Sequence, residues 1–317
     1  MPDQVSAAPV PDKVSAAPDR ATLRLALVVG GLVLAVLLGF GLGRLNEGGT
    51  TTGVPSLAAE HSDPPGVGPH NHGTATGTDQ GAPTEPGGLA VSSAGLTLVP
   101  LSTDFTAGRP GQLRFQVRDV QRRPVTRFAV VHDKPMHLIV VRRDLTGYQH
   151  LHPTMAADGT WSVPLTLAQP GVWRAYTDFT VVADDGAQTA VTLGADLVVP
   201  GDYQPRPLPG PATSTTVDGF TVGYQGTPQA GTTVPLTFRV DGAGGAAQLE
   251  RYLGAYGHLV ALREGDLGYL HVHPEPELVD GQIKFWLTTP GPGRYRLYLD
   301  FQVGPTVHTA EFTLAVP

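Results

Sequence analysis

Short runs in which apolar and polar residues alternate recur along the chain from about residue 89 to its end. They include LRFQVRD, TWSVPLTL and WRAYTDFTV, and further on VPLTFRV, IKFWLTT and YRLYLDF. A period of two places successive side chains on opposite faces of a β-strand. Turn residues separate the runs, and no amphipathic helical stretch lies between them. The pattern therefore predicts antiparallel β-sandwiches.

One run near the N-terminus is different, because residues Leu25 to Gly43 contain no charge and are long enough to cross a membrane as a helix. Lys13, Arg20 and Arg24 precede the run, whereas only Arg44 follows it closely. By the positive-inside rule, we expect an uncleaved signal anchor in the cell membrane, single-pass, with a cytoplasmic N-terminus and extracytoplasmic C-terminal domains. The alternative is a cleaved signal peptide, whose apolar stretch is usually about 7–15 residues.

The segments on either side of this span have low complexity. Residues 1–24 form a Pro/Ala-rich tail, which we expect to be disordered in the cytoplasm. Residues 44–88 are rich in Gly, Thr and Pro and are typical of a flexible linker. His61, His70 and His72 in this linker are either part of a solvated spacer or a weak metal-scavenging tract.

An internal repeat organises the remainder of the chain. MHLIVVRRDLTGYQHLHP at 136–153 matches GHLVALREGDLGYLHVHP at 257–274. Further on, GVWRAYTDFTV at 171–181 matches GRYRLYLDFQV at 293–303. Self-similarity of this kind indicates a duplicated structural unit.

The repeat gives the domain organisation. We expect two tandem immunoglobulin-like antiparallel β-sandwiches, at 89–201 and 213–317, joined by a Pro-rich linker at 202–212. The expected fold class is all-β, with one N-terminal transmembrane helix before the two sandwiches.

Composition narrows the chemistry. The chain has 40 Gly and 30 Pro, which suits short strands and many turns. It has no Cys, so disulfides, thiolate metal sites and cysteine nucleophiles are excluded. Its net charge is -7 and it has no basic block, so nucleic acid is not an expected partner.

Three histidines occupy equivalent positions in the two copies of the internal repeat. HLIVV and YQHLHP are expected to pair as a hairpin, and a loop with an even number of residues places the upstream histidine on the same face as the HxH pair. Facing side chains lie about 5 Å apart, so three imidazoles can reach one ion. The candidate ligands are His137, His150 and His152 in the first copy and His258, His271 and His273 in the second.

A carboxylate follows in each copy, within Arg-x-Tyr-x-Asp. Asp178 and Asp300 are each either a fourth metal ligand or the group that fixes an imidazole tautomer. Imidazole with optional carboxylate and no sulfur suits a Cu or Zn ion. We discount Met136, because a neighbouring strand position points to the other face, and interpret His132 and His308 as ordinary surface or strand histidines.

The same residues have a second interpretation. A Tyr-His-His-Asp set inside a sandwich can be a hydrogen-bonded network that orients strands and binds nothing. Both interpretations remain open from the sequence.

The chain resembles a group of uncharacterised bacterial proteins, of a type frequent in actinobacteria, that are membrane-anchored or secreted. The resemblance rests on MHLIVVRRDLTGYQHLHP at Met136–Pro153, DGTW at Asp158–Trp161 and YTDF at Tyr176–Phe179. It implies a duplicated sandwich outside the membrane and a loose association with heavy metals or copper. In the second copy Gly257 replaces Met136, so a methionine-dependent copper role is in doubt there.

Two functions follow as expectations. The first is metal buffering or delivery by an anchored protein, with one His/His/His(/Asp) cluster in each sandwich. The second is a non-catalytic protein-interaction module. The expected partners are the lipid membrane, through one helix, and a metal-handling or cell-envelope protein. We expect no enzyme, because HExxH, GxSxG and phosphate-loop motifs are absent.

Overall fold

The computed structural model describes residues 86–270 and 272–317, where all the regular elements are β-strands. The predicted cytoplasmic tail, the membrane helix and nearly all of the first linker lie outside the described residues. So do four histidines of interest: His61, His70, His72 and His271. No helix in the described part of the chain has the length and apolar character that a membrane span needs.

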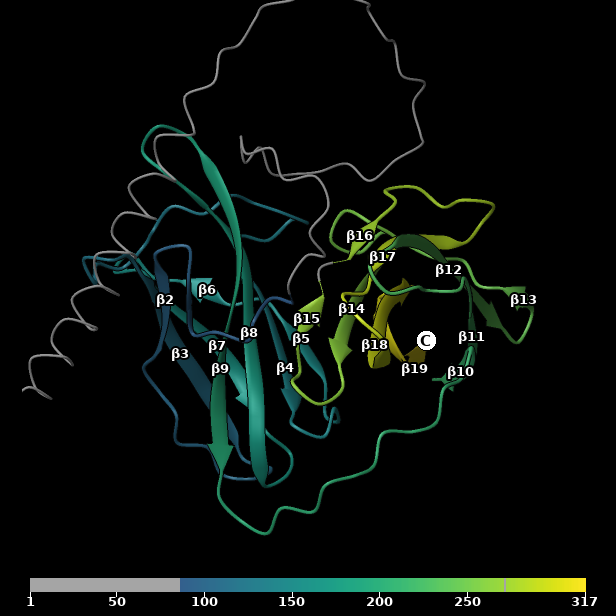
Figure 1. The fold of residues 1–317 in the computed structure, drawn as a ribbon, viewed down its shortest axis with the longest axis horizontal. Coiled ribbons are helices and arrows are strands. Elements are labelled where there is room, and N and C mark those ends of the chain that lie inside the picture. Colours follow the sequence, from purple (N-terminus) through teal and green to yellow (C-terminus); the bar gives the residue numbers. More distant parts are fainter. Residues whose placement is uncertain (1–85, 271) are drawn as a thin grey trace, which may run out of the picture. The chain divides into compact units, whose positions relative to one another are not determined.

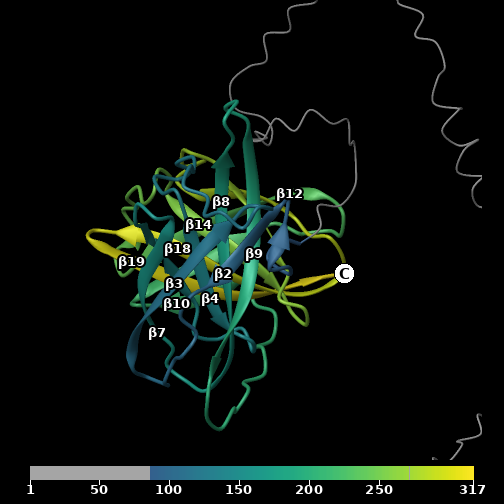
Figure 2. The ribbon, with the colours of Figure 1, turned by 90° about the vertical axis from the view of Figure 1, so that its left-hand side faces the viewer.

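The first sandwich is built from two antiparallel sheets (Figure 1), with strand orders β1-β2-β3-β7-β6 and β5-β4-β8-β9. Its strands are β1 (Ser92–Ser93), β2 (Leu96–Pro100), β3 (Pro110–Arg118), β4 (His137–Arg142), β5 (Gln149–Leu151), β6 (Thr154–Met155), β7 (Thr160–Thr166), β8 (Gly171–Val182) and β9 (Gln188–Val199). The long neighbours β8 and β9 stand out in Figure 2.

The second sandwich repeats this plan, with strand orders β10-β11-β12-β17-β16 and β15-β14-β18-β19. Its strands are β10 (Ser214–Val217), β11 (Phe220–Gln225), β12 (Thr233–Gly242), β13 (Gly245–Ala246, paired with β12), β14 (Gly257–Arg263), β15 (Tyr269–Leu270), β16 (His273–Pro274), β17 (Ile283–Thr288), β18 (Gly293–Val303) and β19 (Thr306–Val316).

The strand order is that of the immunoglobulin sandwich. Immunoglobulin domains place strands A, B, E and D in one sheet and C, F and G in the other. Lettered from β2 onwards, the first sandwich has A-B-E-D facing C′-C-F-G, and the second has the same order from β11 onwards. The prediction of tandem antiparallel sandwiches is therefore confirmed.

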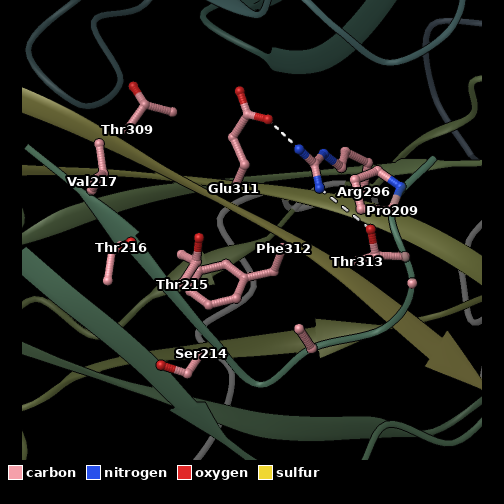
Figure 3. A pocket seen from close by; sticks show the side chains of 12 residues that line it. Pro209, Ser214, Thr215, Thr216, Val217, Arg296, Thr309, Glu311, Phe312 and Thr313 are labelled. Atoms are coloured by element: carbon pink, nitrogen blue, oxygen red, sulfur yellow. Dashed lines mark hydrogen bonds and ion pairs between the residues drawn. The ribbon is translucent and has the colours of Figure 1, made fainter. Parts of the chain in front are cut away.

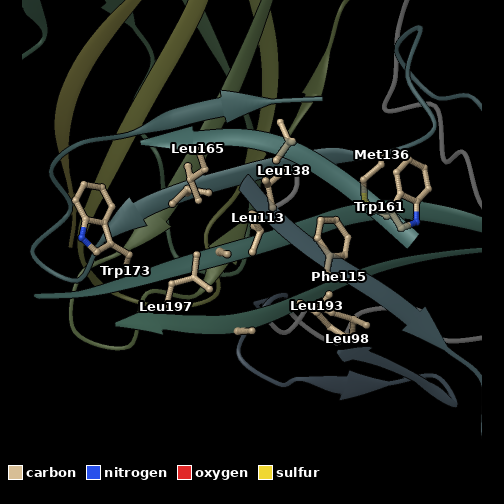
Figure 4. Close-up of a cluster of buried hydrophobic side chains, with 14 of the residues drawn as sticks. Leu98, Leu113, Phe115, Met136, Leu138, Trp161, Leu165, Trp173, Leu193 and Leu197 are labelled. Atoms are coloured by element: carbon tan, nitrogen blue, oxygen red, sulfur yellow. The ribbon is translucent and has the colours of Figure 1, made fainter. Parts of the chain in front are cut away.

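The alternating residues of each strand meet in the core between the sheets. In the first sandwich Phe115, Leu138, Trp161 and Trp173 are each no more than 1% exposed and lie in one cluster (Figure 4). Complete burial of such side chains contributes about 1.5–3 kcal/mol each. Met136, which directly precedes β4, lies in the same core, so it is not a ligand candidate.

All six residues of β4 are buried, and the two faces of the strand have different neighbours. Leu138 belongs to the core of its own sandwich, whereas Ile139 joins a third cluster that includes Val260 and Leu262 of the second sandwich. Both sandwiches fall in one compact unit. The strand is apolar on both faces because its outer face packs against the other sandwich.

Reciprocal hydrogen bonds fix this interface. The Tyr176 hydroxyl donates to the carbonyl of Leu267 at 2.6 Å, and the Tyr298 hydroxyl donates to the carbonyl of Leu145 at 2.7 Å. Tyr176 and Tyr298 are equivalent in the repeat. Leu145 and Leu267 both have a positive φ, of 62° and 63° respectively. The two copies therefore use equivalent surfaces on each other, as in an isologous dimer.

Candidate metal centre

Three histidines of the first sandwich converge on the interface side of the sheet. His137 begins β4, His150 lies in β5 and His152 follows β5. Ile139 pairs with His150, which is the register that an even loop gives, so the predicted parity is confirmed. One ring nitrogen of each histidine lies within 4.8 Å of those of the other two. The structure thus brings together the three imidazoles that the sequence groups in the first copy.

Hydrogen bonds orient two of these rings. His137 Nε2 lies 3.0 Å from the carbonyl oxygen of Val131, and His150 Nδ1 lies 2.8 Å from Oδ2 of Asp300. His137 Nδ1 lies 3.1 Å from His150 Nε2. Because a carbonyl and a carboxylate only accept, these two contacts place one proton on His137 Nε2 and one on His150 Nδ1.

The remaining nitrogens of the two rings face each other. His137 Nδ1 and His150 Nε2 lie 3.1 Å apart, a separation that either a shared proton or a shared metal ion satisfies. Two nitrogens held at 2.0–2.1 Å by one tetrahedral metal ion lie about 3.3 Å apart. The pair has the spacing of two ligands of a common ion.

Burial lowers the pKa of three histidines of the cluster. It lowers the pKa of His137 to about 4 and that of His152 to about 3, and the neighbouring imidazoles lower both further. Burial also holds the pKa of His258 well below its usual range. Neutral imidazole is the form that binds metal ions, so these three rings are in the binding form at neutral pH.

The second sandwich contributes to the same cluster. Asp300 accepts the hydrogen bond of His150 and, at 3.1 Å, that of the Tyr148 hydroxyl. The ring centroid of His258 lies 5.9 Å from that of His150 and 6.3 Å from that of His137. The sequence predicts a separate cluster in each sandwich, but here residues of both sandwiches combine, because the two C′-C-F-G sheets face each other.

Asp178 lies beside the cluster. It is paired in register with His137, and it accepts a hydrogen bond from Thr192 Oγ1 at 2.7 Å. Its negative charge raises the pKa of His137 and so opposes the effect of burial. Asp300 holds the equivalent position opposite His258, yet it reaches across to His150. The two carboxylates therefore have different partners.

Of the second copy's three predicted ligand histidines, His258 is the one whose side chain the structure describes. His271 lies outside the described residues, and His273 begins β16, where it pairs in register with Trp286. Their role as ligands stays a prediction. His308 lies 2.8 Å from a carboxylate oxygen of Asp218 through its Nδ1, as part of a separate pair.

A hollow of about 400 Å³ lies on the second sandwich, and Ser, Thr and Pro side chains make up half of its lining (Figure 3). Arg296 at this hollow donates to Glu311 and, at 3.3 Å, to Thr313. The charge of the guanidinium is therefore balanced within the protein. None of the predicted ligands lines this hollow, so it is not the candidate centre.

Comparison with known families gives the duplication a name. Residues 92–196 and 215–317 each match the family described as Domain of unknown function (DUF8832). The chain belongs to the DUF8832 family. No curated protein is similar in sequence to this tandem of DUF8832 domains.

Solved structures resemble the DUF8832 tandem only distantly. FdeC, an adhesin of Escherichia coli, is 19% identical with a TM-score of 0.25, over 72% of this chain and 66% of that chain. Invasin, a bacterial integrin-binding protein, is 14% identical with a TM-score of 0.21, over 70% of this chain and 39% of that chain. The Ig1-2 module of Drosophila DLAR is 10% identical with a TM-score of 0.19, over 70% of this chain and 98% of that chain. These likenesses carry no function to the DUF8832 domains.

Sequence reasoning missed one member of the cluster, His132 of the first DUF8832 domain. Its ring centroid lies 5.2 Å from that of His258 and 6.2 Å from that of His137. His132 and Asp133 have φ of 48° and 60° in a tight turn before β4, and the equivalent turn of the second domain holds Leu253. Without a counterpart in the repeat, His132 looked like an ordinary surface residue. Its place in a tight turn just before the β4 histidine was the available signal.

Proposed function

We propose that this protein binds a transition-metal ion, Zn(II) or Cu(II), on His137, His150 and His152, and buffers or delivers that ion outside the cytoplasm. The observation that carries the proposal is the convergence of three imidazoles whose ring nitrogens lie within 4.8 Å of one another, with His137 Nδ1 and His150 Nε2 3.1 Å apart. Two ring nitrogens at this distance need a proton or a metal ion between them, because two facing lone pairs repel each other.

The surroundings of the cluster support a metal rather than a proton. Ligating histidines usually donate their second N–H to a carbonyl or a carboxylate, and here Val131 and Asp300 accept those bonds. His152 Nε2 is buried and has no hydrogen-bond partner, which is costly for a polar atom that binds nothing. The low pKa of His137, about 4, opposes an added proton on that ring.

The ligand set supports Zn(II) or Cu(II). Imidazole nitrogen suits both ions, and the chain has no cysteine to favour softer chemistry. The three histidines therefore suit either ion without a sulfur ligand. Anchoring in the membrane and an extracytoplasmic location rest on the apolar run Leu25–Gly43 and the basic residues before it.

Metal uptake by the purified full-length chain tests this proposal. The chain is dialysed against Zn(II) or Cu(II), then against buffer, and its metal content is measured. We expect tightly held metal in the wild type and loss of that metal in His150→Ala. His308→Ala is the matched control, because it removes a histidine bonded to an aspartate outside the cluster. Equal metal content in wild type and His150→Ala would contradict the proposal.

A second candidate function is a protein-interaction module in which the histidines are structural. The observation in its favour is that Asp300 accepts bonds from Tyr148, His150 and Thr309, a network that joins the sandwiches without an ion. This candidate predicts no retained metal and a large loss of thermal stability in metal-free His150→Ala. We propose no catalytic activity, because no catalytic motif occurs in the sequence.

A further inference from the structure

His258 is a buried histidine whose polar atoms are unused. It comes from β14 of the second sandwich, and its residue is 8% exposed. Neither Nδ1 nor Nε2 has a hydrogen-bond partner, and each is shielded from solvent. A buried polar group without a partner is unfavourable, so such a residue calls for an explanation. Its neighbours are the candidate ligands His137 and His150.

A small cavity is lined by His258 together with His137 and His150 of the first sandwich. It has a volume of about 50 Å³ and is lined by residues of both sandwiches, among them His132, His137, His150, Asp178 and His258. A cavity needs only about 10–15 Å³ to hold one water molecule. The space therefore accommodates an ion together with a water ligand.

Ring distances distinguish His258 from the other three histidines. Imidazoles bound at 2.0–2.1 Å to one tetrahedral ion have centroids about 5 Å apart. The centroid distances among His137, His150 and His152 are 5.4, 5.2 and 4.9 Å. Those from His258 to His137 and His150 are 6.3 and 5.9 Å. His258 is thus about one ångström farther away than a bound ligand.

We propose that His258 is the fourth ligand, so that one ion joins the two sandwiches, and that binding draws the His258 ring toward the other three. This inference rests on the proposed function. It assigns the unused nitrogens of His258 and the cavity to one purpose. The second sandwich then contributes to the site in two ways. His258 binds the ion, and Asp300 orients the His150 ring.

A cysteine substitution gives a direct test in the full-length chain. The protein has no cysteine, so His258→Cys introduces one thiol, and Co(II) is the probe. A thiolate bound to Co(II) produces a sulfur-to-cobalt charge-transfer band that imidazole ligands do not give. We expect this band in His258→Cys and not in the matched control His308→Cys.

Affinity supplies a second readout. His258→Ala should weaken Zn(II) binding at least tenfold in competition with a chromophoric chelator, with weaker binding still measurable through the remaining three histidines. Bound Co(II) without a charge-transfer band in His258→Cys, or unchanged affinity in His258→Ala, would overturn this inference and leave the proposed function standing. Failure of the wild type to bind either ion would overturn the proposed function itself.

Discussion

At the residue scale, the chemistry of the centre depends on where each imidazole proton is directed. His150 donates to Asp300, and His137 donates to the carbonyl of Val131. Both bonds leave a ring nitrogen free to bind a metal inside the cluster. A single carboxylate of the second sandwich therefore decides which nitrogen of His150 is available.

Asp300→Asn should weaken metal binding. Loss of the carboxylate removes the group that fixes the His150 tautomer, and such changes typically cost 10–100-fold in metal affinity. Zn(II) competition titrations would measure the effect. Asp218→Asn, which alters the other histidine–aspartate pair of the same sandwich, should leave the affinity unchanged. Equal effects of the two substitutions would contradict the role given to Asp300.

The metal-free chain should lose stability in mild acid. The folded pKa of His137 is about 4 against an ordinary 6.5, so below pH 6.5 the unfolded chain takes up a proton that the folded chain does not. Stability contributed by the neutral ring is complete above pH 6.5 and declines as the pH falls toward 4, by about 1.4 kcal/mol per pH unit. Urea denaturation between pH 7 and pH 4 measures this slope. His137→Leu should flatten it, and an unchanged slope would count against the buried neutral ring.

At the scale of elements, strand periodicity predicts which side chains share a face of a strand, but not which surface packs against that face. The pattern of HLIVV and YQHLHP predicts a hairpin between β4 and β5, and the structure has the register that an even-length loop gives. The sequence could not show that the outer face of β4 packs on β14, because an apolar face looks the same whichever surface covers it. For that reason His258 and Asp300 were assigned to a cluster of their own.

The two tyrosines at the interface between the sandwiches, Tyr176 and Tyr298, should contribute equally to the stability of the fold. Tyr176→Phe and Tyr298→Phe each remove a buried hydroxyl that donates to a carbonyl of the opposite sandwich. Each should lower the free energy of unfolding by about 1–2 kcal/mol, because the carbonyl loses its partner. Chemical denaturation measures the change, with Tyr224→Phe in the core of the second sandwich as the control. A clear difference between the two interface variants would contradict the reciprocal arrangement.

At the scale of the whole molecule, duplication supplies both halves of the interface. Equivalent surfaces of the two sandwiches pack on each other, and the polar cluster lies beside the apolar one. The symmetry is broken at the turn before the interface strand, where the first copy has His132 and the second has Leu253. The repeat alone could not reveal this difference in environment, because His132 has no histidine counterpart to compare.

Metal should stabilise the folded chain. An ion that binds only the folded state adds about 2.7 kcal/mol at a free concentration one hundred times its Kd. Thermal unfolding with Zn(II), and again after a chelator, should show an increase in Tm that the chelator reverses. His150→Ala should show no increase. A Tm that Zn(II) does not raise in the wild type would oppose a folded-state site.

X-ray absorption of the Zn(II)-loaded full-length chain tests the central claim most directly, since it reports the atoms bound to the ion. We predict at least three imidazole nitrogens at about 2.0–2.1 Å, with the outer-shell scattering of histidine rings. A first shell made only of oxygen atoms, or a chain that retains no zinc, would contradict the account.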